Sequence, residues 1–468
     1  MAINKTPLLP GQSPAFAAGA GLPFNAKAAS TASTLSSNYS NPFESILMVF
    51  AVLLLVNHLG RPFEHILIGM RIPAVLCVLG AIVTVASCLS AFKTTPGKML
   101  ALWLIWMVLI LPLSYWRGGS LSYVAYFVAF WVVLYMIIAC APKSFGQLKL
   151  LYLVIAIAAP ANILIAGRFD NQIRFDMEGT FGNADDAAIL AGFAIPFWLF
   201  LTSRWPMFLR VLFALSGTIF LLRVIIMTAT RSMLISLFCM FLIWFWRTSV
   251  LYKISGIMIT AVASIALITT APQSVRDRLA TTFEAFTTDR LRAADDEASG
   301  SAIMRRELLM DGLKTTLKYP IWGVGPGQFT SYRWSALSTS DSPKAGIKTH
   351  NTYVQVAVES GIPALLFYLA WVWTTYRAIA RVRKAAASKA TPGLELGFEM
   401  ASYLELALVF FAVTALFMTM ETHPYMFIMA GAAVAVERLT QAELGRFKDA
   451  QRTVPSRISL APSTAGLR

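Results

Sequence analysis

Long apolar segments with almost no charged residues constrain the fold of this chain more than any other feature. Each runs for about twenty residues, which is enough for a helix to cross a hydrocarbon core of roughly 30 Å. Hydrophobic residues make up 57% of the 468 residues and charged residues only 13%, well below the roughly 25% that is typical of soluble domains. The sequence therefore predicts an all-α, polytopic membrane protein.

We expect about twelve transmembrane helices, with one large extracytoplasmic loop between the ninth and the tenth. The division between two spans around Arg231 is the least distinct, and no internal repeat is convincing. The expected spans lie near residues 44–60, 72–92, 99–115, 120–141, 147–167, 184–203, 207–229, 231–247, 250–271, 351–376, 400–420 and 424–438.

Lysines and arginines in the short connections predict the orientation of the chain. With the N-terminus inside, the inside connections hold most of these residues, including the cluster from Arg377 to Lys389. This is the positive-inside pattern, so both termini are expected in the cytoplasm. The positive-inside pattern then explains much of the +15 net charge. Nucleic acid is therefore not an expected partner.

Composition divides the chain into five regions. Residues 1–42 are rich in Ala, Ser, Thr and Pro, which predicts a disordered cytoplasmic arm rather than a cleaved signal peptide. Helices one to nine occupy 43–271, the extracytoplasmic (periplasmic) loop 272–349, helices ten to twelve 350–439, and a basic cytoplasmic tail 440–468. All four cysteines lie in apolar runs, so we expect no disulfide in the loop and no redox chemistry.

The loop contains a predicted helix followed by a glycine-rich segment. Apolar residues at helical spacing favour a helix over 301–318, with Ser301 as its N-cap and Pro320 beyond its end. Gly323, Gly325 and Gly327 exclude regular structure after it. A dinucleotide site is not expected because no strand precedes these glycines. We expect them to let the backbone approach the membrane surface or a ligand.

A histidine and a glutamate stand at the outer end of the tenth span. His350 begins the span, and Glu359, Gly361 and Pro363 interrupt it, which predicts a broken helix that lines a cavity. His350 and Glu359 are about two and a half turns apart, so both can line one cavity without contact. An isolated interfacial histidine is more often a cap or a structural hydrogen-bonding group, but a carboxylate inside a span requires polar surroundings.

Arginines near the outer ends of two spans are candidates for binding a phosphate group. Arg231 either extends its charge to the interface or faces a cavity and clamps a phosphate, which suits its planar guanidinium. For Arg223, extension to the interface or contact with backbone carbonyls is favoured.

The acidic outer connection before the sixth span allows another type of site. Helix capping by Asn183 or Asp185, together with solvation, is favoured over divalent-cation binding. The carboxylates that could bind a cation are Asp176, Glu178, Asp185 and Asp186.

Taken together, these residues resemble the O-antigen ligase and polymerase superfamily, integral-membrane glycan transferases of bacterial cell surfaces. The sequence differs from the family pattern at Leu309, where a tryptophan is usual, and at Ala184-Asp185, where Pro-Asn is usual. The motifs that carry the resemblance are His350-Asn351 with Glu359 and Gly361, Pro320 with Gly323-Val-Gly325-Pro-Gly327, Thr230-Arg231-Ser232, Arg174 ahead of Gly179-Thr-Phe-Gly182-Asn183, and Arg305.

The resemblance implies transfer of a glycan from undecaprenyl diphosphate to an acceptor sugar, either lipid A core or a growing glycan chain. The reaction would take place at the periplasmic face of the bacterial inner membrane, without a metal or another cofactor. Arg231 and Arg305, with Arg174 as a weaker third, would bind the diphosphate. His350 would be the catalytic base, and Glu359 would orient it or the acceptor, or act as the base itself.

Two other functions are compatible with the sequence. A polytopic transporter or flippase of lipid-linked glycan also uses broken helices and intramembrane charges, although the polar candidates here cluster at the outer ends of the spans. A non-catalytic scaffold of a polysaccharide export complex, with the loop as its docking surface, is the third reading.

Overall fold

The structure is a computed structural model in which part of the chain is described. The described residues are 46–60, 72–170, 174–177, 183–248, 250, 253–254, 269–273, 275–276, 297–337 and 347–453. The chain divides into two units, Met1–Asn41 and Pro42–Arg468, and all described residues belong to the second. The expected arm 1–42, most of the expected span 250–271 and the tail after 453 lie outside the described residues.

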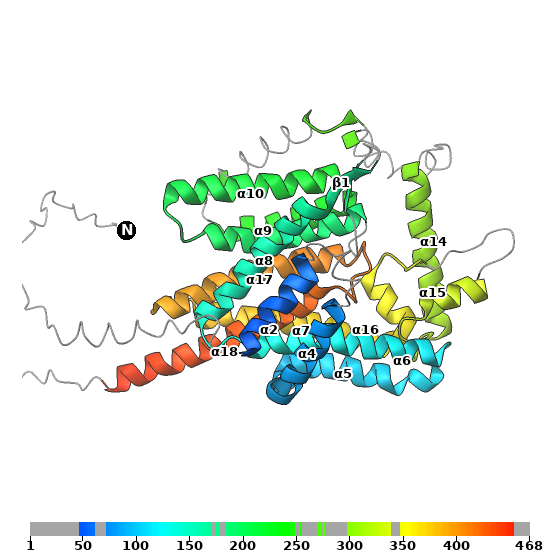
Figure 1. The fold of residues 1–468 in the computed structure, drawn as a ribbon, viewed down its shortest axis with the longest axis horizontal. Helices are drawn as coiled ribbons and strands as arrows, with labels where there is room; N and C mark the ends of the chain where they lie inside the picture. Colours follow the sequence, from blue (N-terminus) through cyan, green and yellow to red (C-terminus); the bar gives the residue numbers. More distant parts are fainter. Residues whose placement is uncertain are drawn as a thin grey trace, which may run out of the picture. The chain divides into compact units, whose positions relative to one another are not determined.

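Helices form most of the described chain, as the apolar segments predict (Figure 1). The one departure from an all-α fold among the described residues is an antiparallel hairpin, in which Gly167 pairs with Met177 and Asp170 with Arg174. The elements are α2 (Ile46–Leu55), η1 (Val56–Gly60), α4 (Ile72–Cys88), η2 (Leu89–Lys93), α5 (Thr95–Leu109), η3 (Leu111–Leu113), α6 (Arg117–Phe127), η4 (Val128–Val132), α7 (Val133–Cys140), α8 (Phe145–Ala166), β1 (Gly167–Asp170), β2 (Arg174–Met177), α9 (Ala184–Thr202), α10 (Met207–Met227), α11 (Arg231–Arg247), α14 (Glu297–Lys318), α15 (Phe329–Tyr332), η6 (Arg333–Leu337), α16 (Thr352–Ala385), α17 (Pro392–Thr414) and α18 (Pro424–Thr453).

Several helices have the length and composition of membrane spans. Among the described residues, six long apolar helices could cross a membrane, and three shorter apolar helices accompany them. The six are Arg117–Cys140, Phe145–Ala166, Ala184–Thr202, Met207–Met227, Thr352–Ala385 and Pro392–Thr414. The total of twelve spans and the periplasmic position of the loop stay predictions.

Local sequence signals explain where several of these helices begin, and some boundaries differ from expectation. Asn183 caps α9, because its Oδ1 accepts a hydrogen bond from the backbone N–H of Asp186 at 2.8 Å. The expected N-cap Ser301 is wrong: α14 begins at Glu297, so Ser301 lies inside the helix. Helix α18 continues to Thr453, well beyond the expected end of the last span at 438.

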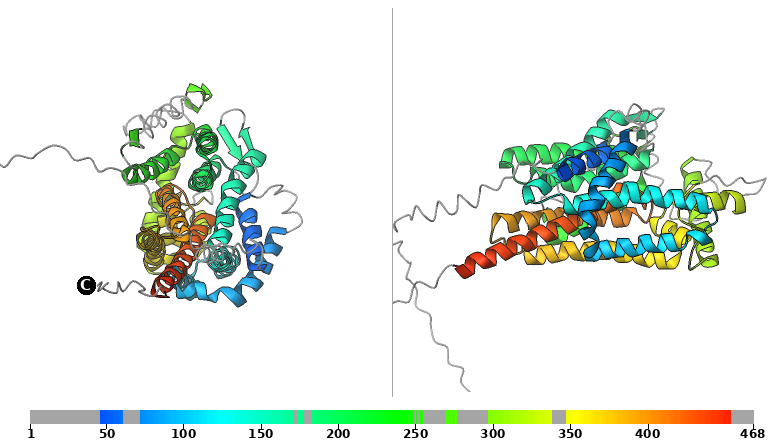
Figure 2. Two further views of the ribbon diagram at one scale, coloured as in Figure 1. Left: turned by 90° about the vertical axis from the view of Figure 1, so that its left-hand side faces the viewer. Right: turned by 60° about the horizontal axis from the view of Figure 1, so that its bottom comes forward.

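Helix α16 lies at the centre of the packing. It packs against α5, α14, α17 and α18, and Figure 2 shows α16, α17 and α18 side by side. Its Tyr368 and Trp371 join Trp103 of α5, Phe127 of α6 and Phe427 of α18 in a buried aromatic cluster. Ring centroids in this cluster are 5.0 to 6.0 Å apart, a spacing at which edge-to-face contacts are favourable. The cluster fixes the helix that bears both His350, at its start, and Glu359.

The predicted break in α16 occurs at Gly361, which has φ 81° and ψ 171°. Pro363 has no N–H, so the carbonyl of Glu359 lacks its donor within the helix. The N–H of Ile362 is also diverted, since it donates to the carbonyl of Pro320 at 2.7 Å. The break therefore leaves carbonyl oxygens in the protein interior that need partners from elsewhere.

The glycine-rich segment supplies these partners. Val324 N–H donates to the carbonyl of Val358 at 2.9 Å, and Gly325 N–H donates to the carbonyl of Glu359 at 2.8 Å. Gly325 has φ 108°, and a Cβ there would lie 1.9 Å from Ser114 Oγ. In the structure the glycine-rich segment packs on the break in α16, and its approach to the membrane surface or a ligand stays a prediction.

Replacing Gly361 by alanine is expected to destabilise the fold by about 3 kcal/mol. A Cβ at this position would lie 1.9 Å from the carbonyl oxygen of Ile321, and φ 81° is unfavourable for any residue with a side chain. Thermal unfolding in detergent measures the change. Gly445→Ala is the matched control, because no atom lies within 4 Å of its added Cβ; a similar loss in both variants would contradict the packing described.

Candidate functional site

Asp185 joins three helices that are far apart in the sequence. This residue lies in the first turn of α9. Its Oδ1 accepts a hydrogen bond from Thr230 Oγ1 at 2.9 Å, and its Oδ2 forms an ion pair with Arg305 Nη2 at 2.7 Å. Thr230 immediately precedes α11 and Arg305 belongs to α14. The Asp185 junction, defined as Asp185, Thr230 and Arg305, therefore brings the turn that bears Arg231 close to Arg305.

The Arg305 guanidinium has capacity beyond this ion pair. Its side chain is 35% exposed and that of Asp185 is 16% exposed. An arginine has five N–H donors, and within the described part of the chain Asp185 is the one carboxylate that pairs with this arginine. The carboxylate thus holds Arg305 in position while other N–H groups remain for a second anion.

Arg231 lies at the N-terminus of a helix. It is the first residue of α11, where the helix dipole presents partial positive charge. The side chain is half-buried. Two residues earlier, buried Ala229 adopts φ 52°, in the left-handed region that alanine rarely enters. A cation at a helix N-terminus after a strained turn is well placed to attract an anion, since both positive charges act on the same ligand.

His350 also has a left-handed backbone, with φ 52°. It is half-buried directly before Asn351, whose Oδ1 caps α16 by accepting from Val354 N–H at 3.0 Å. Burial lowers the pKa of His350 below its ordinary value of 6.5, and the positive charge of Arg305 lowers it further, against an opposing effect of Asp185. His350 is therefore electrostatically coupled to the Asp185 junction, and its imidazole is neutral near pH 7.

Glu359 is linked to the His350 turn through one intermediate side chain. The carboxylate of Glu359 is buried, with 4% of the residue exposed. Its Oε2 accepts from Gly327 N–H at 2.9 Å and its Oε1 from Gln355 Nε2 at 2.7 Å. Gln355 Oε1 in turn accepts from the backbone N–H of Thr349 at 2.9 Å. This Glu359–Gln355–Thr349 relay ties the glycine-rich segment to the residue that precedes His350.

Two charged residues beside this relay were missed by the sequence reasoning. Lys348 Nζ forms an ion pair with Glu421 Oε1 at 2.9 Å, and Glu421 is buried. Burial acts to lower the pKa of Lys348, but the carboxylates of Glu421 and Glu359 outweigh it and the net pKa is raised. The lysine thus stays charged two residues before His350. The signal in the sequence was Glu421 itself, a carboxylate within the apolar connection between α17 and α18.

The acidic connection between α8 and α9, which contains the β1–β2 hairpin, contributes less to the candidate site than the other elements do. Arg174 begins β2, opposite Asp170 in the ladder, and its part in anion binding stays a prediction. Glu178 lies outside the described residues. Within the part of the chain that the structure describes, no group of three or more His, Cys, Asp or Glu side chains is arranged to hold a metal ion. Asp185 instead forms the junction with Arg305 and Thr230.

The contacts of Arg223 agree with the structural role that the sequence favoured for it, which includes contact with a backbone carbonyl. Its Nη1 donates to Thr270 Oγ1 at 2.6 Å and its Nη2 to the carbonyl of Thr270 at 3.4 Å. These contacts tie α10 to the residues that follow the undescribed segment 255–268. Arg223 is accordingly distinct from the cations of the Asp185 junction.

Part of the chain is similar to a known protein family. Residues 216–369 match a family model described as O-antigen ligase, whereas no curated protein matches the chain. The matched segment contains Arg231, Arg305, His350 and Glu359, and this confirms the resemblance that the motifs indicated. Over residues 216–369, about a third of the chain, the sequence is therefore similar to the O-antigen ligase family.

Proposed function

We propose that this protein transfers a glycan from undecaprenyl diphosphate to an acceptor sugar during synthesis of O-antigen or another surface polysaccharide. The match to the O-antigen ligase family supports an enzyme of the ligase or polymerase type. The observation that carries the proposal is the Asp185 junction, because it joins Arg305 to the turn of Arg231 and is electrostatically coupled to His350. We place the site at the periplasmic face of the inner membrane, with both termini in the cytoplasm.

The diphosphate is the leaving group of this reaction. As the bond between the anomeric carbon and the diphosphate oxygen breaks, the electron pair and negative charge move to that oxygen. Arg231 and Arg305, with Arg174 as a weaker third, stabilise this charge, and guanidinium groups suit phosphate oxygens because they bind in a planar, bidentate manner. Asp185 holds Arg305 in position through one of its N–H groups, and other N–H groups of the guanidinium remain available to bind phosphate oxygens.

The oxygen of the acceptor hydroxyl forms the new glycosidic bond. Its oxygen attacks the anomeric carbon and its proton passes to His350, whose neutral imidazole can accept it. Glu359 acts as a positioning residue through the Glu359–Gln355–Thr349 relay, since both of its carboxylate oxygens already accept hydrogen bonds. The products are the extended or newly attached glycan and undecaprenyl diphosphate, with no metal ion assigned to any step.

The lowered pKa of His350 predicts the pH dependence of the reaction. The base must be neutral, so the rate should decline as the pH falls through the pKa of His350, and the half-maximal rate should lie below pH 6.5. Initial rates of purified protein from about pH 5 to pH 8 measure this profile. A half-maximal rate at a pH above 6.5 would argue against His350 as the base.

A deletion strain tests the proposed function in the cell. We expect undecaprenyl-diphosphate-linked glycan to accumulate at the periplasmic face. Loss of long chains with single units still attached indicates a polymerase, and loss of all attachment indicates a ligase. Accumulation on the cytoplasmic side would instead indicate a flippase, and a normal surface glycan would contradict any role in its synthesis.

A further inference from the structure

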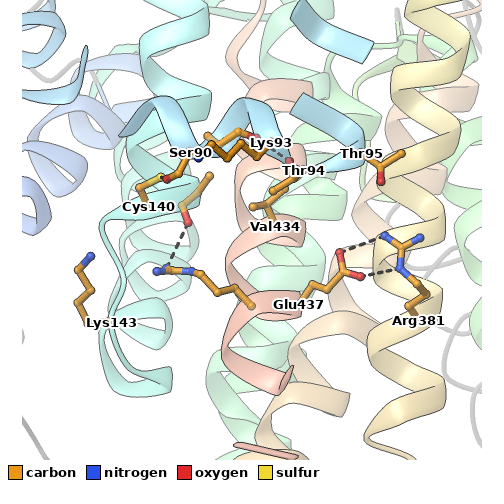
Figure 3. Close-up of a pocket in the computed structure, with 12 residues that line it drawn as sticks. Ser90, Lys93, Thr94, Thr95, Cys140, Lys143, Arg381, Val434 and Glu437 are labelled. Carbon is orange, nitrogen blue, oxygen red and sulfur yellow. Dashed lines mark hydrogen bonds and ion pairs between the residues drawn. The ribbon is translucent and has the colours of Figure 1, made fainter. Parts of the chain in front are cut away.

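A basic pocket lies towards the opposite end of α16 from His350 (Figure 3). Its volume is about 540 Å³, and it is lined by residues of η2, α5, α7, α16 and α18 and of the connection after α7. Arg381, which lines it, is about twenty residues beyond the break at Gly361, or roughly 30 Å along the unbroken part of α16 at 1.5 Å per residue. That length matches the thickness of a hydrocarbon core, so the pocket belongs to the face opposite the proposed active site.

Positive charge dominates this pocket. Four of its lining residues are cations, namely Lys93, Lys143, Arg381 and Arg438, and the one acidic lining residue is Glu437. Glu437 already pairs with Arg381, at 2.5 Å between Oε1 and Nε. Within the described part of the chain, Lys93 and Lys143 have no carboxylate partner. In Figure 3, Lys143 and the Arg381–Glu437 pair lie on opposite sides of the pocket.

The pocket is built from fixed groups as well as exposed lysines. Arg438 Nη2 donates to the carbonyl of Ala139 at 3.2 Å and to that of Pro142, and these contacts hold its guanidinium at the wall. Thr94 caps α5 at the same wall by accepting from Gly97 N–H at 3.2 Å. The N-terminal end of α5 adds its partial positive charge to that of the four cations. The combined charge favours an anionic ligand.

An exposed apolar face lies on the helix that precedes the pocket-lining residue Ser90, and it favours one class of anionic ligand. Side chains on the outer face of α4 and η2 follow helical spacing up to Ser90, which lines the pocket. The members of this apolar face are Val78 (55% exposed), Ile82 (66%), Val85 (50%) and Leu89 (58%). A ligand with a phosphate group and hydrocarbon chains matches both surfaces, whereas a free anion matches only the pocket.

We propose that this pocket binds the phosphate headgroup of an anionic membrane lipid in the cytoplasmic leaflet, with the acyl chains along the apolar face of α4. Basic pockets between membrane helices on the cytoplasmic side are suited to such headgroups. The lipid acts as a structural ligand that joins α5, α7, α16 and α18. This site is separate from the proposed glycan-transfer site, and its assignment to the cytoplasmic leaflet rests on the proposed periplasmic position of that site.

Titration of the purified full-length protein with phosphatidylglycerol, followed by native mass spectrometry, tests the proposal. Wild-type protein is expected to bind phosphatidylglycerol at least about tenfold more tightly than phosphatidylcholine. The double variant Lys93→Gln/Lys143→Gln should lose most of this preference, because two unpaired charges are removed from exposed side chains. Lys98→Gln is the matched control, since Lys98 is an exposed lysine of α5 outside the pocket lining.

Three results would overturn the proposal. The first is equal affinity of the wild-type protein for phosphatidylglycerol and phosphatidylcholine, a comparison that needs no variant. The second is unchanged phosphatidylglycerol binding in the double variant, or an equal loss in Lys98→Gln. The third is displacement of phosphatidylglycerol by an equal concentration of inorganic phosphate, which would identify a site for free phosphate instead. Thermal unfolding of each variant checks that the protein remains folded.

Discussion

Replacing His350 by asparagine is expected to lower the rate of glycan transfer by roughly 10²- to 10⁴-fold. The substitution removes the imidazole that accepts the acceptor proton, while asparagine tolerates the left-handed backbone that this position requires, with φ 52°. The rate is measured as product formed from an undecaprenyl-diphosphate-linked oligosaccharide by protein in proteoliposomes. Alanine at the same position should lose as much activity and, in addition, about 1 kcal/mol of stability from backbone strain.

His423 provides the matched control for this experiment. It is half-buried and its ring stacks on Tyr425, with ring centroids 5.9 Å apart. His423→Asn is expected to keep most of the transfer rate. If His350→Asn kept the wild-type rate as well, another group would have to be the base and the proposed role of His350 would be wrong.

Arg305→Ala is expected to lower the transfer rate by roughly 10²- to 10³-fold, because a cation that stabilises the leaving diphosphate is removed. This substitution also leaves Asp185 without its ion-pair partner. The double variant Arg305→Ala/Asp185→Asn separates the two effects. If Arg305 binds diphosphate, the double variant stays inactive; if its purpose is to neutralise Asp185, the double variant regains activity.

Arg306, the residue next to Arg305, supplies a control for the Arg305→Ala variant. Arg306 is exposed on the same helix, so Arg306→Ala should change the rate little. The two alanine variants differ by one position and remove the same charge. Equal losses in both would show that general positive charge on α14 matters rather than the Arg305–Asp185 geometry, and the assignment of Arg305 would then fail.

Local patterns explain how much of the fold could be predicted. The apolar runs gave the helices, and Gly361 with Pro363 gave the break in α16, because these signals act through the backbone of the same segment. The packing of the glycine-rich segment on that break could not be inferred in the same way. It depends on carbonyls of Val358 and Glu359 that meet donors more than thirty residues earlier in the chain.

The candidate site was predictable in its residue types and less so in its connections. Arg231 and His350 stood out because arginine and histidine at the outer ends of apolar spans suit phosphate binding and proton transfer. Arg305, in the expected loop, was singled out only by the resemblance to the family. Asp185 was seen only as a cap or a metal ligand. Its pairing with Arg305 spans 120 residues of sequence, and a single carboxylate in an acidic connection gives no signal of such a partner.

For Glu359, too, the type of surroundings could be predicted from the sequence but the residues that supply them could not. A carboxylate inside an apolar span predicts polar surroundings, and the structure supplies them as Gln355 and the backbone of Gly327. The spacing of Glu359 and His350 predicted no contact between them, and the structure links Glu359 to the residue before His350 through Gln355 and Thr349. Only the three-dimensional structure identifies Gln355, since an uncharged glutamine in a helix is unremarkable in sequence.

The most direct test of the account is release of undecaprenyl diphosphate by purified wild-type protein in nanodiscs that contain a lipid-linked glycan. With an acceptor sugar present, the account predicts that undecaprenyl diphosphate and the transferred glycan appear in equal amounts. Arg305→Ala and His350→Asn should abolish both. Intact lipid-linked glycan after complete binding of the donor and the acceptor, with no bond broken, would contradict the central claim that the Asp185 junction and His350 form a transfer site.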